Sequence, residues 1–151
     1  MQHRSAAFTA INPPQQVPAL VLHDGTVIAE SIAICRYFEA LNPSPAMFGV
    51  GALEQAVVEM WNRRLEQNLF FPVSQVFRHL HSAMKEMEVP QVAAWGEANK
   101  ARAVAFLPIL ERQLEIGPFV CGAHYSVADT TALVAIELHE ARQARGRVRA
   151  P

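Results

Sequence analysis

A glutamate and a serine, Glu30-Ser31, stand directly before a run of helix-forming residues that begins at Ile32. Serine is preferred at a helix N-cap because its hydroxyl oxygen can accept a hydrogen bond from a free backbone N–H group. The unpaired N–H groups at a helix start and the positive end of its dipole also attract anions. The pair therefore indicates a place where a carboxylate could bind, with Ser31 predicted as the N-cap.

The residues before this helix predict a β-hairpin. Two apolar runs, 17–22 and 27–28, flank Asp24-Gly25, a strong signal for a two-residue turn because glycine tolerates the positive φ that such turns need. Pro18 cannot donate to a β-ladder, so it marks a strand edge or a special turn. With a cis Val17–Pro18 bond, the Val17 backbone would point outward, where an extended peptide could pair with it. On pattern alone, an ordinary hairpin followed by a helix is the favoured interpretation.

These residues together resemble the glutathione-binding signature of the glutathione S-transferase family. The order, spacing and types that carry the resemblance are those of Gln16-Val17-Pro18-Ala19-Leu20, Asp24-Gly25 and Glu30-Ser31. The resemblance implies that the bond before Pro18 is cis and that the Val17 backbone pairs with the cysteinyl part of glutathione. It also implies that Glu30 and Ser31 hold the γ-glutamyl end, with Gln16 as a further contact.

The resemblance implies a fold class, α+β and mostly α, and a division of the chain into domains. Residues 1–42 are expected to be the C-terminal part of a thioredoxin-like glutathione-binding domain, with its β-hairpin and one helix. Residues 43–52 contain two prolines and two glycines and are expected to form a linker. Residues 53–151 are expected to form the all-α domain of the family, incomplete at its end.

Apolar periodicity supports three long helices in this last region. Residues recurring every three or four positions predict one helix over about 53–84, kinked at Pro72, and another from about 94 to 114. A third is predicted from Val127 to about 145. Before it, Ser126 and Asp129 have the spacing of a reciprocal capping box, so we expect both to be structural. They also resemble the folding motif of the family. Thr130 of this chain stands where the family often has an aliphatic residue, which is expected to weaken the hydrophobic staple with Tyr125.

No metal or redox chemistry is indicated by the histidines and cysteines. His79 and His81 lie two apart on a predicted helix and point in different directions, so they are expected to be solvated or boundary residues. Cys35 shares a helical face with apolar residues and is expected to be a core thiol, and Cys121 is far from it. Sparse cysteine usage fits a reducing compartment, so a cytoplasmic location is expected.

Charge and hydropathy argue against two further partners. The net charge is −1, and the basic cluster at 142–149 is typical of a solvated helix end, so nucleic acid is not expected as a partner. No apolar run reaches the length of a membrane span, and no signal-peptide core follows the first residues. We therefore expect no membrane partner.

The resemblance implies an enzyme that conjugates the thiolate of glutathione to small electrophiles, with glutathione as co-substrate, no metal, and a homodimer. In the family the activating Tyr, Ser or Cys lies in a strand–helix–strand segment that precedes the region matched here. Ser5 and Thr9 do not have that context, so the catalytic residue stays unassigned and a fragment or shortened product is expected. A non-catalytic interaction module of the same fold and an inactive fragment remain as alternatives.

Overall fold

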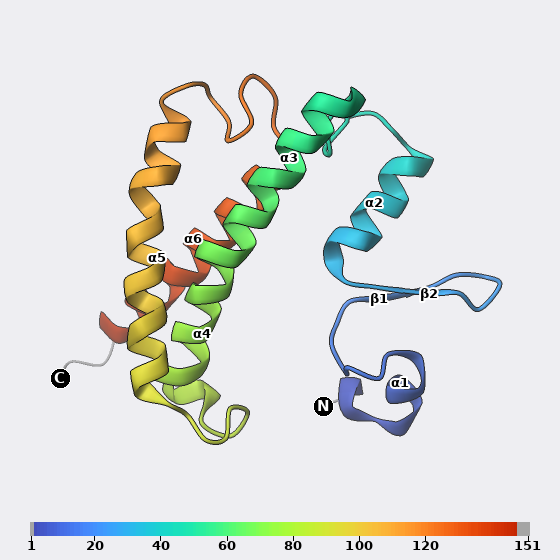
Figure 1. Ribbon diagram of the computed structural model, residues 1–151. Coiled ribbons are helices and arrows are strands. Elements are labelled where there is room, and N and C mark those ends of the chain that lie inside the picture. The colour runs from blue at the N-terminus through green and yellow to red at the C-terminus, as the bar shows by residue number, and fades with distance from the viewer. Residues whose placement is uncertain (1, 148–151) are drawn as a thin grey trace. The chain divides into compact units, whose positions relative to one another are not determined.

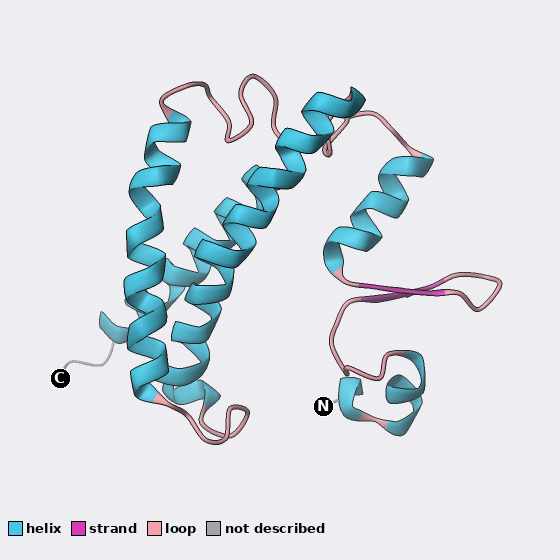
Figure 2. Cartoon of the chain, viewed as in Figure 1, coloured by secondary structure: helices cyan, strands magenta, loops and turns pink. Residues whose placement is uncertain are grey.

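The computed structural model describes residues 2–147, and the side chains of residues 2–138 (Figure 1). It is mostly helical, and its one sheet among these residues is a two-stranded antiparallel hairpin (Figure 2). This confirms the predicted fold class. The chain divides into two compact units, Met1–Ala46 and Met47–Pro151, which we call the hairpin unit and the helical unit.

The hairpin unit begins with two short helices and ends with a longer one. Its elements are η1 (Gln2–Arg4), α1 (Ala6–Ile11), β1 (Ala19–Val21), β2 (Val27–Ala29) and α2 (Ser31–Leu41). The hydroxyl oxygen of Ser5 caps α1 by accepting the Phe8 N–H at 3.2 Å. This is the N-cap role that serine favours.

The hairpin has a loop one residue longer than predicted. The Gly25 N–H donates to the Leu22 carbonyl at 3.0 Å, and the Leu22 N–H donates to the Thr26 carbonyl at 2.9 Å. The loop is therefore His23-Asp24-Gly25, with Gly25 at φ +85°, and the two-residue turn was wrong. A three-residue loop of this kind needs a left-handed residue at its last position, which glycine provides without strain.

The side chain of Asp24 supports the same loop. Its Oδ1 accepts the Thr26 N–H at 2.9 Å, and this hydrogen bond, with a smaller contribution from the Thr26 side chain, holds the pKa of Asp24 below its ordinary value. The carboxylate is fully exposed, at the end of the hairpin away from α2.

Helix α2 leaves part of its apolar surface uncovered by the described residues. Cys35 is exposed, and Phe38 and Leu41 are 48% and 60% exposed. The expectation that Cys35 is a core thiol is therefore wrong. These residues do recur at helical spacing, but α2 packs against the two short strands of the hairpin, which are too small to bury a full helix face.

The helical unit contains three long helical segments. Its elements are α3 (Gly51–Leu65), the π-helical turn η2 (Glu66–Phe70), α4 (Phe71–Leu80), η3 (Ser82–Met84), α5 (Ala93–Leu114) and α6 (Val127–Arg147). Instead of one helix to residue 84, the structure has a π-turn before Pro72 and ends α4 at Leu80. The Phe71 N–H bonds to the Glu66 carbonyl, five residues back. Proline lacks an N–H and its ring crowds the preceding turn, which favours a local widening.

The core of the helical unit lies where α6 packs against α3, η2 and α4, and where α5 packs against η2 and α4. Small residues of α6 face larger ones on the other segments, so the backbones approach closely. The buried cluster consists of Trp61, Leu65, Leu69, Val73, Ala103, Phe106, Leu110, Val120, Ala128, Ala132 and Ala135. The buried Asn62 has a polar partner on α6, because the half-buried Thr131 Oγ1 donates to Asn62 Oδ1 at 2.7 Å.

The predicted linker, residues 43–52, spans the boundary between the two units. The Met47 carbonyl accepts the Val127 N–H at 2.9 Å, and Phe48 is buried. Gly49 has φ +86°, and a Cβ there would lie 2.9 Å from backbone and side-chain atoms of Glu54, so only glycine fits. The first residues of the helical unit are thus packed in place, while the domain limits given from sequence stay a prediction.

Two kinds of feature are not found among the described residues. No helix between residues 2 and 147 is long and apolar enough to cross a membrane. No group of three or more His, Cys, Asp or Glu side chains in the described part of the chain could hold a metal ion. The side chains of the basic cluster at 142–149 lie outside the described residues.

Candidate functional site

The register of the hairpin brings the residues of the predicted signature together. Ala19 pairs with Ala29, so the residues just outside the strands, 17–18 on one side and 30–31 on the other, leave the hairpin at the same end. Gln16, Val17, Pro18, Glu30 and Ser31 are all exposed there. A ligand at this end of the hairpin can therefore reach the backbone before β1 and the start of α2 together.

The start of α2 differs from the sequence prediction in one respect. The N-cap is Glu30, at φ 70° and ψ 124°, and its side chain makes no capping hydrogen bond. Ser31 is the first helical residue, so the prediction of Ser31 as N-cap was wrong. The reason is that Glu30 adopts a positive φ, which turns the chain into the helix one residue earlier. Its carbonyl accepts the first helical bond, from the Ile34 N–H at 3.0 Å.

This geometry leaves backbone N–H groups without a partner in the first turn of α2. The N–H groups of Ser31, Ile32 and Ala33 lie in the first turn, where a helix has no carbonyl to accept them. The side chain of the N-cap residue does not satisfy them either. Free N–H groups and the positive end of the dipole attract a carboxylate. A non-glycine residue at positive φ is uncommon and is enriched at functional sites.

The segment before β1 is held by a buried asparagine that the sequence analysis did not select. Asn12 is buried, and its Nδ2 donates to the Gln16 carbonyl at 2.7 Å. The Gln15 N–H donates to the Asn12 carbonyl at 2.9 Å, with Gln15 at φ 58°. The Val17–Pro18 peptide bond is cis, and Val17 is 66% exposed. An asparagine directly before two prolines was the available signal, since its side chain readily bonds a nearby turn.

The two hydroxyl residues nearest the chain start have structural partners. Ser5 caps α1, and the Thr9 hydroxyl donates to the Ser5 carbonyl at 2.9 Å and accepts the Gln15 Nε2 at 3.0 Å. These bonds organise residues 5–15. The thiolate-activating residue expected in the family is not assigned to any residue of this chain.

The motif at the start of α6 is a compact hydrogen-bonded cluster. Asp129 Oδ2 accepts both the N–H and the hydroxyl of Ser126, each at 2.9 Å, and Oδ1 accepts the Val120 N–H at 2.7 Å. Ser126 therefore donates to Asp129, whereas a reciprocal box has the serine oxygen accepting from the helix backbone. In place of a hydrophobic staple, the Tyr125 and Thr130 hydroxyls lie 3.1 Å apart.

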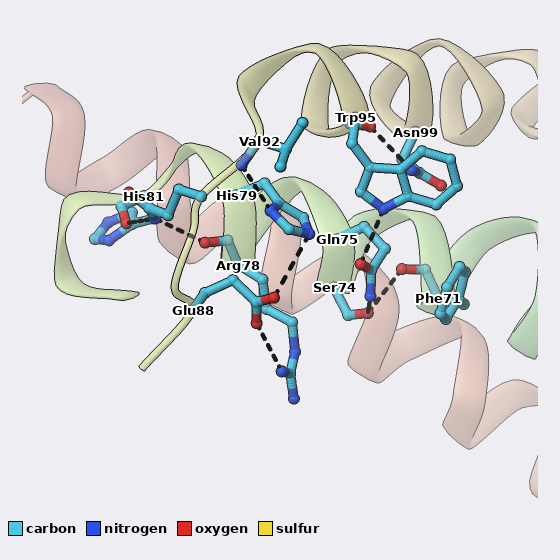
Figure 3. Close-up of polar contacts among 11 residues, drawn as sticks. Phe71, Ser74, Gln75, Arg78, His79, His81, Glu88, Val92, Trp95 and Asn99 are labelled. Carbon is cyan, nitrogen blue, oxygen red and sulfur yellow. Dashed lines mark hydrogen bonds and ion pairs between the residues drawn. The ribbon is translucent and has the colours of Figure 1, made fainter. Parts of the chain in front are cut away.

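The histidines predicted at the boundary belong to a polar network between α4 and α5 (Figure 3). His79 Nδ1 accepts the Val92 N–H at 3.1 Å, and its Nε2 lies 3.8 Å from Glu88. Arg78 donates to the same Glu88 carboxylate at 3.0 Å. Trp95 Nε1 donates to the side-chain oxygen of Gln75, on α4, at 3.1 Å. These contacts hold the end of α4, the loop at Glu88 and the start of α5 together.

Comparison with known proteins identifies the family of the hairpin unit and of the whole chain. The family model described as glutathione S-transferase, N-terminal domain, matches residues 1–41. Glutathione S-transferase 2 of Saccharomyces cerevisiae is 35% identical over 136 residues, covering 89% of this chain and 58% of that protein. Maleylacetoacetate isomerase of Rattus norvegicus is 31% identical over 130 residues, covering 85% of this chain and 56% of that protein. The chain thus spans under three fifths of the length of either relative.

Solved structures extend the likeness to the fold. Gtt2 from Saccharomyces cerevisiae matches with a TM-score of 0.84 and 33% identity, over 99% of this chain and 71% of that one. A glutathione S-transferase domain-containing protein from Marinobacter aquaeolei matches with a TM-score of 0.86 and 34% identity, over 91% of this chain and 68% of that one. Sequence identity, shared fold and the matched N-terminal segment agree, and the chain belongs to the glutathione S-transferase family.

Proposed function

We propose that the chain binds glutathione at the end of the hairpin where the Val17–Pro18 segment and the start of α2 meet. The γ-glutamyl carboxylate accepts from the free N–H groups and the hydroxyl at Ser31, and the γ-glutamyl ammonium pairs with the Glu30 carboxylate. The Val17 backbone hydrogen-bonds the cysteinyl residue as a short strand does, and Gln16 adds a polar contact. The observation that carries the proposal is the register, which sends residues 17–18 and 30–31 to one end of the hairpin.

We propose further that the complete protein is a glutathione transferase. Deprotonation of the glutathione thiol gives the thiolate, which forms a carbon–sulfur bond with a small electrophile. Either a leaving group departs with its electron pair, or the anion formed by addition takes up a proton. No metal is needed for this chemistry. We propose a cytoplasmic homodimer with a role in detoxification as the setting of this activity.

The binding proposal is tested by calorimetric titration with glutathione. Glu30→Ala and Ser31→Ala should each weaken binding about three- to tenfold, because each variant removes a charge-assisted or dipole-supported hydrogen bond worth about 0.7–1.4 kcal/mol at an exposed site. Glu97→Ala and Ser82→Ala, exposed residues of the helical unit, are the matched controls. Equal affinity of both site variants and the wild type would refute the assignment.

A ligand control separates the two halves of the site. Cysteinylglycine lacks the γ-glutamyl group, so its weaker binding should no longer change on Glu30→Ala or Ser31→Ala. If those variants weaken both ligands equally, they act through the fold of the hairpin unit and not through contact with the γ-glutamyl end.

Binding and turnover distinguish the enzyme from a non-catalytic module. Conjugation of glutathione to an activated aryl halide is measured with the same protein used for calorimetry. Binding without conjugation by the complete protein would favour the interaction module over the transferase.

A further inference from the structure

The most deeply buried side chain of the hairpin unit is polar. Among the residues of that unit whose burial is described, Asn12 is the one that is buried, with 5% of its surface exposed. Burying an amide is unfavourable unless the amide forms hydrogen bonds. The contacts of this side chain, and not apolar packing, therefore explain its place in the fold.

The backbone of Asn12 is fixed on both sides. Its N–H donates to the Phe8 carbonyl at 2.8 Å at the end of α1, and its carbonyl accepts the Gln15 N–H at 2.9 Å. Gln15 in turn donates from Nε2 to the Thr9 hydroxyl at 3.0 Å. The side chain of Asn12 thus projects from a backbone that α1 and the following turn hold in place.

This side chain orients the peptide group between Gln16 and Val17. Asn12 Nδ2 donates to the Gln16 carbonyl at 2.7 Å. The Gln16–Val17 bond is trans, and the cis bond is the next one, before Pro18. In a planar trans peptide the C=O and the N–H point in opposite directions. The Val17 N–H therefore points away from Asn12, and it forms no hydrogen bond to a described residue.

We propose that Asn12 is a positioning residue for glutathione: by holding the Gln16 carbonyl, it directs the Val17 N–H towards the ligand. Without this hydrogen bond the peptide group can rotate. A site whose Val17 N–H faces the ligand only part of the time has its affinity reduced by that fraction. The inference rests on the proposed glutathione site, and it adds a buried residue that acts through Val17.

Variants of the same shape separate this role from packing. Asn12→Leu fills a similar volume without a donor, and Asn12→Asp keeps the shape but its carboxylate cannot donate. Each should weaken glutathione about three- to tenfold in calorimetry on the full chain, because a neutral hydrogen bond no longer orients the contact. Titrations use conditions in which circular dichroism shows the variant to be folded, and Asn12→Asp is the second variant if Asn12→Leu does not fold. Full affinity in a folded variant would overturn the proposal.

Thr9→Val is the matched control, because it removes a polar group of the same segment that does not contact the Gln16 carbonyl. It should leave the glutathione affinity unchanged. Equal weakening by Thr9→Val and Asn12→Leu would show that the order of the whole segment sets the affinity, which would overturn the specific role of Asn12.

A second ligand locates the effect within the site. Cysteinylglycine keeps the cysteinyl group that the Val17 backbone is proposed to bind, so Asn12→Leu should weaken it by the same factor as glutathione. Glu30→Ala should weaken glutathione alone. A loss in Asn12→Leu that is confined to glutathione would assign the effect to the γ-glutamyl end and contradict the proposal.

The free protein provides a readout that does not depend on glutathione. In the ¹³C,¹⁵N-labelled chain, Asn12→Leu should shift the Gln16 carbonyl carbon and the Val17 amide, with residues 19–29 nearly unchanged. An unchanged Gln16 carbonyl resonance would overturn the positioning role. If the wild type does not bind glutathione, the proposed function itself fails. If glutathione binds and Glu30→Ala weakens it while Asn12→Leu does not, the positioning role alone fails.

Discussion

At the scale of single residues, Asp129 has the largest structural role among the motif residues. One carboxylate satisfies the Val120 N–H and two donors of Ser126, and all three residues are at most 9% exposed. It therefore joins the loop before α6 to the first turn of that helix. Buried donors left without an acceptor are far more costly than the net gain of an ordinary hydrogen bond.

Asp129→Ala should reduce the free energy of unfolding by about 2–4 kcal/mol, since it leaves the Val120 and Ser126 N–H groups buried without an acceptor. Asp129→Asn retains one oxygen acceptor and should lose about half of that. Urea unfolding monitored by circular dichroism measures both. Glu97→Ala, on the exposed side of α5, should lie within about 0.5 kcal/mol of the wild type, and an equally mild Asp129→Ala would contradict this role.

The sequence indicated candidate residues for the site but not their backbone geometry. Ser31 was expected at a helix start because serine favours the N-cap, and Glu30 and Ser31 were selected as site residues because they resemble the family signature. Which of them would be the N-cap depended on the positive φ of Glu30, which no local propensity indicates for a glutamate. Asn12 was not selected because its importance arises from burial and from a bond to the Gln16 carbonyl, and both depend on the folded loop.

At the scale of elements, α4 and α5 approach each other closely at Gly96. A Cβ placed there would lie 2.6 and 2.8 Å from side-chain atoms of Leu80, at the end of α4. The same pair of helices is joined by the Trp95–Gln75 and Val92–His79 hydrogen bonds. The close approach, and not local preference, explains a glycine within a helix, where it is otherwise unfavourable by about 1 kcal/mol.

Gly96→Ala should destabilise the chain by about 1–2 kcal/mol, because the clash with Leu80 exceeds the gain in helix propensity. In a Leu80→Ala background the same change should become neutral or stabilising. A double-mutant cycle from urea unfolding measures the coupling. Ala98→Gly, at an exposed position of α5, is the control that measures the effect of helix propensity on the free energy of unfolding without a clash. A stabilising Gly96→Ala in the wild-type background would contradict the account.

The sequence predicted those helices in which apolar residues recur regularly. Apolar spacing predicted the bounds of α5 and α6 to within a few residues, because in a long amphipathic helix apolar residues recur over many turns. The π-turn at 66–70 and the early end of α4 at Leu80 were missed. Both depend on how the chain accommodates Pro72 and on the bonds that Gln91 donates to the carbonyls of Arg78 and His81, and neither is encoded in spacing.

At the scale of the whole molecule, burial and the proposed glutathione site fall in different units. Among the residues whose burial is described, Asn12 is the one buried residue of the hairpin unit, and all others belong to the helical unit. The proposed glutathione contacts are exposed and largely from the backbone, at residues 17 and 31–33. Such a site depends on local geometry, so a binding measurement resolved by residue tests it better than global stability does.

The most direct test is a titration of the ¹⁵N-labelled chain with glutathione, followed by ¹H–¹⁵N correlation spectra. We expect the largest shift changes at the amides of Val17, Ser31, Ile32 and Ala33, with the amides of α3 to α6 nearly unchanged. The Ser31→Ala variant should require about three- to tenfold more glutathione for the same changes. Shifts confined to the helical unit, or unchanged amides at the start of α2 under saturating glutathione, would contradict the assignment of this site.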